Sequence, residues 1–436
     1  MKNLESLSNL NLFDDNMILT GKVTKIVGLT IEADGPLLGI GTRCEIENTL
    51  GNKVLSEIVG FKDNRIILMP YGDSEGIAPG SKVKNVAYGN TVKVSEELLG
   101  RILDGLGNPI DNKGSLNKYT LKSVYNNPPD PMDREIINNV LPSGIKSIDA
   151  LMSMGKGQRV GIFAGSGVGK SVLLGMIARN SDADVNVIAL IGERGREVRE
   201  FIERDLGEDG LKRSVVIVAT SDQSPLVRKL GAFVASTVAE FFREQGKNVM
   251  FMMDSVTRFA MAQREIGLTV GEPPTTKGYT PSVFALLPKL LERVGTKKNE
   301  GAITGLYTVL VEGDDMNDPI ADSVRSIIDG HIVLDRKLAA KNHFPAIDVL
   351  MSASRLMKEV VDDEHFKKAG QFRDLLAAYV EAEDLINIGA YVKGSNNRID
   401  EAILKHDDMI DFLRQSIDDS FDFETSKKMM FSILDK

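Results

Sequence analysis

The chain has 436 residues, of which 42% are hydrophobic and 26% are charged, and its formal net charge at pH 7 is −9. This length predicts two or three domains, and the acidic balance gives no global indication of nucleic-acid binding. Because no apolar run approaches the roughly 18 residues that span a bilayer and no signal-peptide core is present, we expect a cytoplasmic protein that contacts membranes only peripherally.

Residues 1–16 are polar and contain regularly spaced leucines. Leu4, Leu7 and Leu10 stand three positions apart, as one stripe of a short amphipathic helix would. Two interpretations stay open for this segment: a frayed terminus, or a helix that docks on a partner.

The pattern changes between residues 17 and 95, where short β-branched runs alternate with turn signals. The runs at 21–28 and 65–69 are examples. Several short strands at this spacing predict a small β-barrel, and we find no catalytic constellation in it. Cys44 is the only cysteine, so it cannot form an internal disulfide, which is typical of a protein in a reducing compartment.

The remainder of the chain changes character twice more. Gly and Pro are dense over residues 98–130, which indicates fixed turns or a linker. From Gly144 to Arg355, apolar strands alternate with helical patterns, the signature of a parallel α/β sheet, and the residues that follow are charged and helical. The sequence therefore predicts an α/β protein with four segments: an N-terminal docking segment (1–16), a β-barrel domain (17–95), an α/β core (96–355) and a C-terminal helical domain (356–436).

The best-defined motif is a glycine-rich loop between a strand and a helix. Glycines let successive backbone N–H groups surround an anion, and the helix start adds its positive end. A lysine at the end of the loop can reach the outer phosphates of ATP, and the serine after it can ligate Mg²⁺. Ala164 replaces the first glycine of the strict pattern, which is tolerable if that residue is still in the strand. We expect ATP to contact Gly165, Ser166, Gly167, Val168, Gly169, Lys170, Ser171 and Val172, with Ser171 as a magnesium ligand.

A carboxylate follows the next predicted strand, residues 185–191. Glu193 stands just after this apolar run, and the carboxyl end of a strand in an α/β sheet faces the ligand crevice. We therefore predict that Glu193 polarises the attacking water, the alternative being a solvated loop charge. Arg194 either contacts the γ-phosphate or braces Glu193, or it forms a structural ion pair.

A second carboxylate ends the hydrophobic run at 248–254. Asp254 comes after the phosphate loop in chain order, where an aspartate that holds Mg²⁺ through water is expected. Arg258 follows four residues later, and we assign it no role.

Several longer motifs resemble those of the hexameric rotary ATPase family, which includes the F1 catalytic subunit and the type III export ATPases. The resemblance covers about residues 17–436. It rests on residues 192–194, on residues 254–260, and on the loop at 271–283. A narrower resemblance to the flagellar and injectisome export ATPases, and to the flagellar branch in particular, comes from residues 311–322, 389–395 and 341–348.

This resemblance implies an architecture and further site residues. The fold would be an N-terminal β-barrel, a RecA-like P-loop core and a C-terminal α-helical domain. Arg355 matches the arginine finger, which would reach the ATP of the adjacent subunit, with a local salt bridge as the alternative. Phe344 stands where the family usually has a tyrosine packed on adenine, and Phe412 is either the other wall of that pocket or a core residue.

The resemblance also implies an assembly and a function. We expect a homohexamer that hydrolyses Mg-ATP to power flagellar protein export, at the inner face of the cell membrane. The implied partners are a stator or regulator bound through the N-terminal segment, a central stalk protein, the export gate and substrate–chaperone complexes. An injectisome ATPase and the catalytic subunit of an ion-translocating rotary ATPase remain alternatives.

Two other classes are less well supported. A nucleic-acid translocase would need aromatic platforms beside a basic groove, whereas the barrel region offers Phe61, Tyr71 and Tyr88 among scattered acids. We therefore expect no nucleic-acid partner. A non-catalytic nucleotide-binding subunit is disfavoured because the lysine of the loop and both carboxylates are present.

Overall fold

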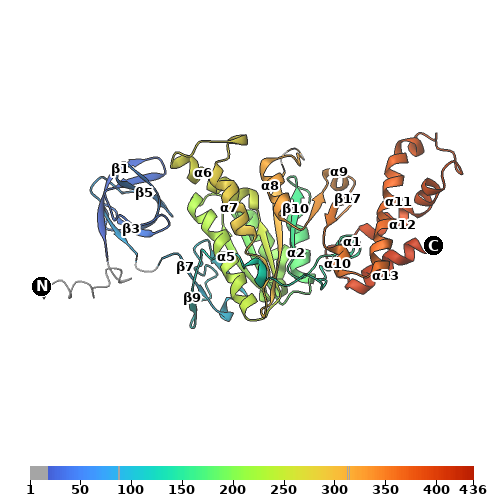
Figure 1. The fold of residues 1–436 in the computed structure, drawn as a ribbon, viewed down its shortest axis with the longest axis horizontal. Coiled ribbons are helices and arrows are strands. Elements are labelled where there is room, and N and C mark those ends of the chain that lie inside the picture. The colour runs from blue at the N-terminus through green and yellow to red at the C-terminus, as the bar shows by residue number, and fades with distance from the viewer. Residues whose placement is uncertain (1–17, 87–88, 312, 314) are drawn as a thin grey trace.

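The computed structural model describes residues 18–86, 89–311, 313 and 315–436. The predicted docking segment, residues 1–16, lies outside these described residues. Along the long axis of the molecule, a barrel of strands is followed by a large sheet between helices and then by a group of helices (Figure 1). No helix in the described ranges is both long enough and apolar enough to cross a membrane.

The first region is a closed antiparallel barrel with the strand order β1-β2-β5-β4-β3-β6. Its strands are β1 (Thr20–Val27), β2 (Thr30–Ala33), β3 (Arg43–Glu47), β4 (Lys53–Lys62), β5 (Arg65–Pro70) and β6 (Lys82–Asn85). Side chains alternate between the two faces of a strand, and Ile31, Ile46, Ile58 and Leu68 fill the interior with at most 1% of their surface exposed. The predicted barrel is confirmed.

The second region is a sheet with the strand order β17-β16-β10-β15-β13-β11-β12-β8, with β14 paired to β15 outside this order. All neighbours from β16 to β8 are parallel, whereas β17 and β14 run antiparallel to their partners. The strands are β8 (Arg101–Asp104), β10 (Arg159–Ala164), β11 (Val185–Ile191), β12 (Ser214–Ala219), β13 (Val249–Asp254), β14 (Gly295–Thr296), β15 (Ala302–Leu310), β16 (Gly330–Leu334) and β17 (Ile347–Ser354).

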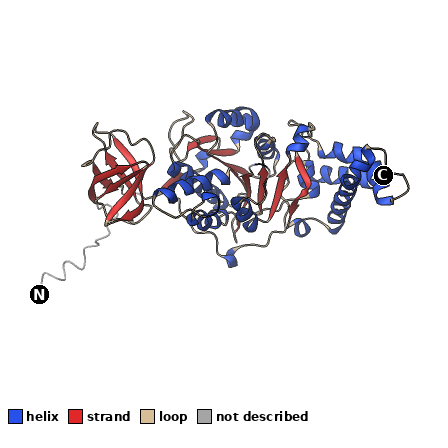
Figure 2. Cartoon of the chain, turned by 90° about the horizontal axis from the view of Figure 1, so that it is seen from above, coloured by secondary structure: helices blue, strands red, loops and turns tan. Residues whose placement is uncertain are grey.

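Helices cover both faces of this sheet (Figure 2), which explains why the central strands are apolar along their whole length. The helices packed on one face are α5 (Pro225–Glu244), α6 (Val256–Thr269), α7 (Pro281–Leu291) and α8 (Pro319–Ile327). Those on the other face include α1 (Lys146–Leu151) and α2 (Lys170–Asn180). Shorter connecting helices are α3 (Gly195–Glu200), a π-helical turn (Phe201–Leu206), α4 (Gly207–Lys212), α9 (Arg336–Ala340) and α10 (Met357–Val360). The predicted parallel α/β core is confirmed.

The prediction of turns or a linker over residues 98–130 is wrong for two stretches, Arg101–Asp104 and Thr120–Ser123, which are strands. β8 (Arg101–Asp104) is the outermost strand of the large sheet and pairs in parallel with β12. The buried Arg101 side chain donates to Asp111 over 2.7 Å, which holds the following turn against the strand. Two further short strands, β7 (Thr91–Val94) and β9 (Thr120–Ser123), form a separate antiparallel pair.

The C-terminal region consists of α11 (Asp363–Asn387), α12 (Asn397–Leu413) and α13 (Phe423–Leu434). These helices pack on one another and on α1, which lies just ahead of the strand leading to the phosphate loop. The predicted C-terminal helical domain is confirmed.

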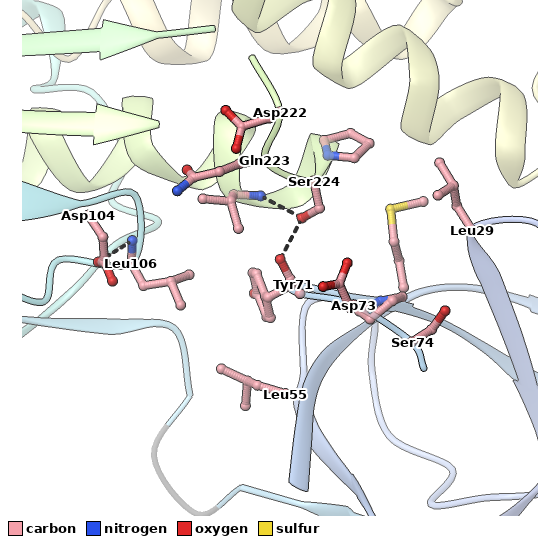
Figure 3. Close-up of a pocket in the computed structure, with 15 residues that line it drawn as sticks. Leu29, Leu55, Tyr71, Asp73, Ser74, Asp104, Leu106, Asp222, Gln223 and Ser224 are labelled. Atoms are coloured by element: carbon pink, nitrogen blue, oxygen red, sulfur yellow. Dashed lines mark hydrogen bonds between the residues drawn. The ribbon is translucent and has the colours of Figure 1, made fainter. Parts of the chain in front are cut away.

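The barrel meets the core through buried polar contacts. Lys229 on α5 lies 3.2 Å from the Glu57 carboxylate of β4, and both side chains are largely buried. Ser224, at the start of α5, donates to the backbone oxygen of Tyr71 over 2.9 Å. A cavity of about 660 Å³ lies at this junction, with Asp73 and Ser74 on the barrel side and Asp222 on the core side (Figure 3).

Candidate active site

The glycine-rich loop connects the central strand β10 to α2. Ala164 is the last residue of β10 and is fully buried. It is therefore still in the strand, which is the condition under which its methyl group is tolerated in place of glycine. Gly167 and Gly169 have φ angles of 79° and 90°, a left-handed conformation that glycine adopts without the strain of a Cβ atom. Gly169 then caps the start of α2 at Lys170. Backbone N–H groups at the first turn of such a helix favour an anion.

Two carboxylates lie opposite the loop because their strands are neighbours. β11 and β13 pair in parallel with Leu190 beside Asp254, and Glu193 follows β11 by two residues. The Lys170 Nζ atom is 2.5 Å from Asp254 Oδ1 and 3.6 Å from Glu193 Oε1. The structure therefore brings Lys170, Glu193 and Asp254 together at one point.

Burial and mutual charge shape the titration of these groups. Burial, reinforced by the negative charge of Asp254, raises the pKa of Glu193 to about 7. Burial alone would lower the pKa of Lys170, but the two neighbouring carboxylates outweigh it and raise that pKa. The lysine is thus held charged between two acids.

Lys170 and Glu193 line a cavity of about 1100 Å³, slightly larger than the roughly 300–1,000 Å³ of most small-molecule sites. Asp254 is only 3% exposed and touches Lys170 from behind, without lining the cavity itself. The predicted residues that line the cavity are Gly165, Ser166, Gly167, Gly169, Lys170, Ser171, Val172, Glu193 and Arg194. Val168, also in the loop, is only 1% exposed and does not line the cavity. Arg194 reaches the cavity rim, where its largely exposed guanidinium donates to Glu197 over 3.1 Å.

The two predicted adenine contacts differ in position. Phe344 is 42% exposed, and its ring carbons lie 3.7 Å from the place that a Cβ atom on Gly169 would take, so it stands beside the loop. Phe412 is only 3% exposed and packs against Phe372 with ring centroids 5.6 Å apart. It does not line the cavity, and its position agrees with the core interpretation.

Arg355 lies away from this cavity. It follows β17, the antiparallel strand at one edge of the sheet, and its side chain is exposed. Its backbone N–H donates to the backbone carbonyl oxygen of Asp329 over 2.9 Å, and its guanidinium donates only weakly to the Arg325 carbonyl over 3.4 Å. Within the described part of the chain, no carboxylate forms an ion pair with Arg355, so the local salt bridge considered from the sequence is not seen there.

Comparisons with known proteins match all three regions. Residues 144–354 match the ATP synthase alpha/beta family, nucleotide-binding domain, and residues 23–87 match the beta-barrel domain of that family. Residues 361–432 match the T3SS EscN ATPase C-terminal domain.

Whole-length relatives give the same result. The flagellum-specific ATP synthase of Bacillus subtilis (strain 168) is 55% identical over 95% of this chain and 94% of that protein. The type 3 secretion system ATPase of Xanthomonas euvesicatoria is 49% identical over 95% of this chain and 94% of that protein. The solved structure of the assembled ATPase EscN, from the type III secretion system of enteropathogenic E. coli, is 45% identical and has a TM-score of 0.91, over 95% of this chain and all of that one.

The chain belongs to the ATP synthase alpha/beta family. The resemblance to its export branch is confirmed, because the similar proteins include flagellum-specific and type 3 secretion members. The fold class predicted for a member of this family is confirmed as well.

Sequence reasoning missed several residues at the site of this ATP synthase alpha/beta family member. Thr257 and Arg258 on α6 line the cavity, and the Thr257 hydroxyl accepts the Leu310 backbone N–H over 2.9 Å. Thr308, on β15, donates to Asp254 over 2.8 Å. A hydroxyl inside an otherwise apolar strand was a usable signal for Thr308, but its partner lies more than 50 residues away in sequence.

Proposed function

We propose that the chain hydrolyses ATP with Mg²⁺ at the phosphate loop and that this hydrolysis powers flagellar, type III protein export. The observation that supports the hydrolase most strongly is the contact of Lys170, which lines the cavity beside the phosphate loop, with both Glu193 and Asp254. These are the three charges that phosphoryl transfer to water requires: a cation for the phosphates, a carboxylate for the metal, and a carboxylate for the water.

In this proposal the loop binds the phosphates of ATP. Backbone N–H groups over 165–169 and at the start of α2, at Ser171 and Val172, surround the phosphate oxygens. The Lys170 ammonium leaves its two carboxylates and pairs with the outer phosphates. Phe344, half-exposed beside the loop, offers its ring face to the adenine.

The residues present fit a magnesium ion. Oxygen ligands suit this cation, and the Ser171 hydroxyl and the Asp254 carboxylate supply oxygen atoms. Lys170 now places a positive charge between the two acids, which indicates that the site is arranged to hold a cation. When bound there, Mg²⁺ would neutralise charge on the phosphates, with the Ser171 hydroxyl as a ligand and Asp254 holding the ion through water.

Glu193 orients the attacking water in this scheme. The water oxygen bonds to the γ-phosphorus while the bond to the β–γ bridging oxygen breaks, and ADP keeps that electron pair. Glu193 accepts a hydrogen bond from the water and so fixes its direction of approach. Arg194 is paired with Glu197 at the cavity rim. Because it directly follows Glu193 in sequence, it can either brace Glu193 or contact the γ-phosphate.

Arg355 acts, in our proposal, on the ATP of a neighbouring copy in a homohexamer. Its guanidinium is exposed and has no carboxylate partner within the described ranges of its own chain. An arginine supplied from an adjacent subunit neutralises charge that develops during transfer. The relative EscN was solved as an assembled ATPase and also in complex with its central stalk EscO, which supports a ring and a stalk partner here.

The cellular part of the proposal is protein export. We propose that the ring works in the cytoplasm at the inner face of the cell membrane, where it releases or unfolds export substrates and their chaperones at the export gate. A stator or regulator would bind the N-terminal segment, residues 1–16, and no nucleic acid would be involved. The name of the flagellum-specific relative from Bacillus subtilis supports the flagellar part of this proposal.

The hydrolase is tested by phosphate release from ATP with Mg²⁺ and with EDTA. We expect turnover with Mg²⁺ only, and its loss in Lys170→Ala. Lys118→Ala is the matched control, because Lys118 is exposed and lies outside the cavity. Equal phosphate release by wild type and Lys170→Ala would contradict the assigned site.

The export role is tested by complementation. In a flagellated bacterium that lacks its own export ATPase, the wild-type chain should restore filament subunits to the medium and Glu193→Gln should not. A second candidate, an injectisome ATPase, is favoured by the 49% identity to a type 3 secretion system ATPase. Restoration of injectisome secretion alone would support that candidate and contradict flagellar export.

A further inference from the structure

Thr308 places a hydroxyl group inside the sheet, next to the carboxylate assigned to Mg²⁺. It lies on β15, between the strand that leads to the phosphate loop and the strand that ends in Asp254. Thr308 is fully buried and stands opposite Ile162 of β10. Its Oγ1 atom is 2.8 Å from Asp254 Oδ1 and 3.2 Å from the Met253 carbonyl oxygen.

This hydroxyl lies among apolar and aromatic neighbours along its strand. The neighbouring positions Leu306, Tyr307 and Val309 are apolar or aromatic and buried. Valine has nearly the same shape as threonine, so packing alone does not require the hydroxyl. Since a buried hydroxyl needs a hydrogen-bond partner to offset its lost hydration, its contact with a carboxylate indicates a use for the polar group.

Two side chains bind the same oxygen of Asp254. Oδ1 accepts both from Thr308 and from Lys170, whereas no donor among the described residues contacts Oδ2. When Lys170 moves to the phosphates, Thr308 is the remaining side-chain donor on Oδ1. Hydrogen bonds to charged acceptors are stronger than neutral ones, so the hydroxyl can hold the Asp254 carboxylate in one orientation after Lys170 has moved.

We propose that Thr308 is a positioning residue for magnesium: its hydroxyl holds the Asp254 carboxylate in the orientation that binds the ion. This inference rests on the proposed function, since it assumes a magnesium ion at Asp254. Groups that orient a metal ligand in this way typically contribute about 10–100-fold to metal affinity. Thr308 itself touches neither nucleotide nor metal.

The test measures nucleotide binding and needs no turnover. A fluorescent ATP analogue is titrated into wild type, Thr308→Val and Thr308→Ser, once with MgCl₂ and once with EDTA. We expect Thr308→Val to lose about tenfold or more of the affinity that Mg²⁺ adds, with the EDTA affinity unchanged. Thr308→Ser keeps the hydroxyl and should retain most of the magnesium effect.

Thr304→Val is the matched control for a buried hydroxyl on the same strand. Thr304 accepts the Gly157 backbone N–H over 2.8 Å and is 2% exposed, but it makes no contact with Asp254. We expect this variant to keep the full magnesium effect. An equal loss in Thr304→Val and Thr308→Val would overturn the positioning role, because any disturbance of β15 would then suffice.

The outcomes separate this inference from the proposed function. A wild-type chain whose affinity is the same with MgCl₂ and EDTA would contradict the magnesium site itself, and Thr308 with it. A wild-type magnesium effect that is fully retained in Thr308→Val would overturn only the role of Thr308. If Thr308→Val does not fold, Thr308→Ala replaces it, and unchanged EDTA affinity shows that the site is intact.

Discussion

Lys170 of the phosphate loop and Arg355 each follow a strand of the same sheet, but their positive charges are balanced differently. Lys170 lies between two carboxylates of its own chain. Arg355, beyond the edge strand β17, has no carboxylate partner within the described residues and is exposed. A cation that is already neutralised must exchange partners to bind a phosphate, whereas an exposed and unpaired arginine is available to an anion from another molecule. We propose on this basis that one chain supplies the binding site and that its neighbour supplies an arginine needed for turnover.

The largest effect should come from Arg355→Ala, which tests the second half of this comparison. We expect kcat to fall by about 10³–10⁵, the range for arginines supplied in trans, while nucleotide affinity and ring formation stay near wild type. Steady-state phosphate release, analogue binding and light scattering measure the three quantities. Arg336→Ala is an informative comparison, because Arg336 lines the chain's own cavity and should affect binding instead. Wild-type kcat in Arg355→Ala would contradict the trans role.

Glu193→Gln tests the first half of the comparison. The amide keeps the shape of the side chain but is a poorer acceptor for the attacking water, so we expect kcat to fall by about 10²–10⁴ with ATP still bound. Single-turnover phosphate release and analogue titration separate the two effects. Glu203→Gln, an exposed glutamate paired with Arg199, is the control and should behave as wild type. Near-normal turnover in Glu193→Gln would contradict the assignment of Glu193 as the residue that orients the attacking water.

Arg194→Ala should have a smaller effect, because its guanidinium is largely exposed and paired at the cavity rim. Exposed charges are screened by water and salt, so we expect a loss in kcat of about tenfold, far below that of a preorganised and buried donor. The dependence of kcat on salt concentration provides the check. A loss as large as that of Arg355→Ala would mean that Arg194 binds the γ-phosphate directly.

Ala164→Gly should have the smallest effect on activity. Ala164 ends β10 and is buried, so glycine restores the strict loop pattern without moving the backbone N–H groups that bind the phosphates. We expect kcat and nucleotide affinity near wild type, and a free energy of unfolding lowered by about 0.5–1 kcal/mol, because glycine weakens a strand. Denaturant unfolding measures this loss. A marked change in nucleotide affinity would show that residue 164 takes part in binding the phosphates.

The sequence predicted the elements whose signals are local. The strand, glycine loop and helix around Lys170 are contiguous, and the strands that end near Glu193 and Asp254 are continuous apolar runs, so the α/β core followed from pattern. Its RecA-like class and the role of Arg355 came from the family resemblance. β8 (Arg101–Asp104) was missed because it is four residues long among turn signals and its partner β12 lies more than 100 residues later. Thr308 and Lys229 were missed for the same reason: their partners, Asp254 and Glu57, are brought near only by the tertiary fold.

The most direct test of the account mixes two inactive variants. Arg355→Ala and Glu193→Gln are assembled together at several ratios, with light scattering to follow ring formation, and phosphate release is measured. If Arg355 acts on the neighbouring ATP, an intact Glu193 from one subunit meets an intact Arg355 from the next, so activity should rise above both parents and be highest near equal mixing. Mixed rings that form but stay inactive at every ratio would contradict catalysis shared between subunits.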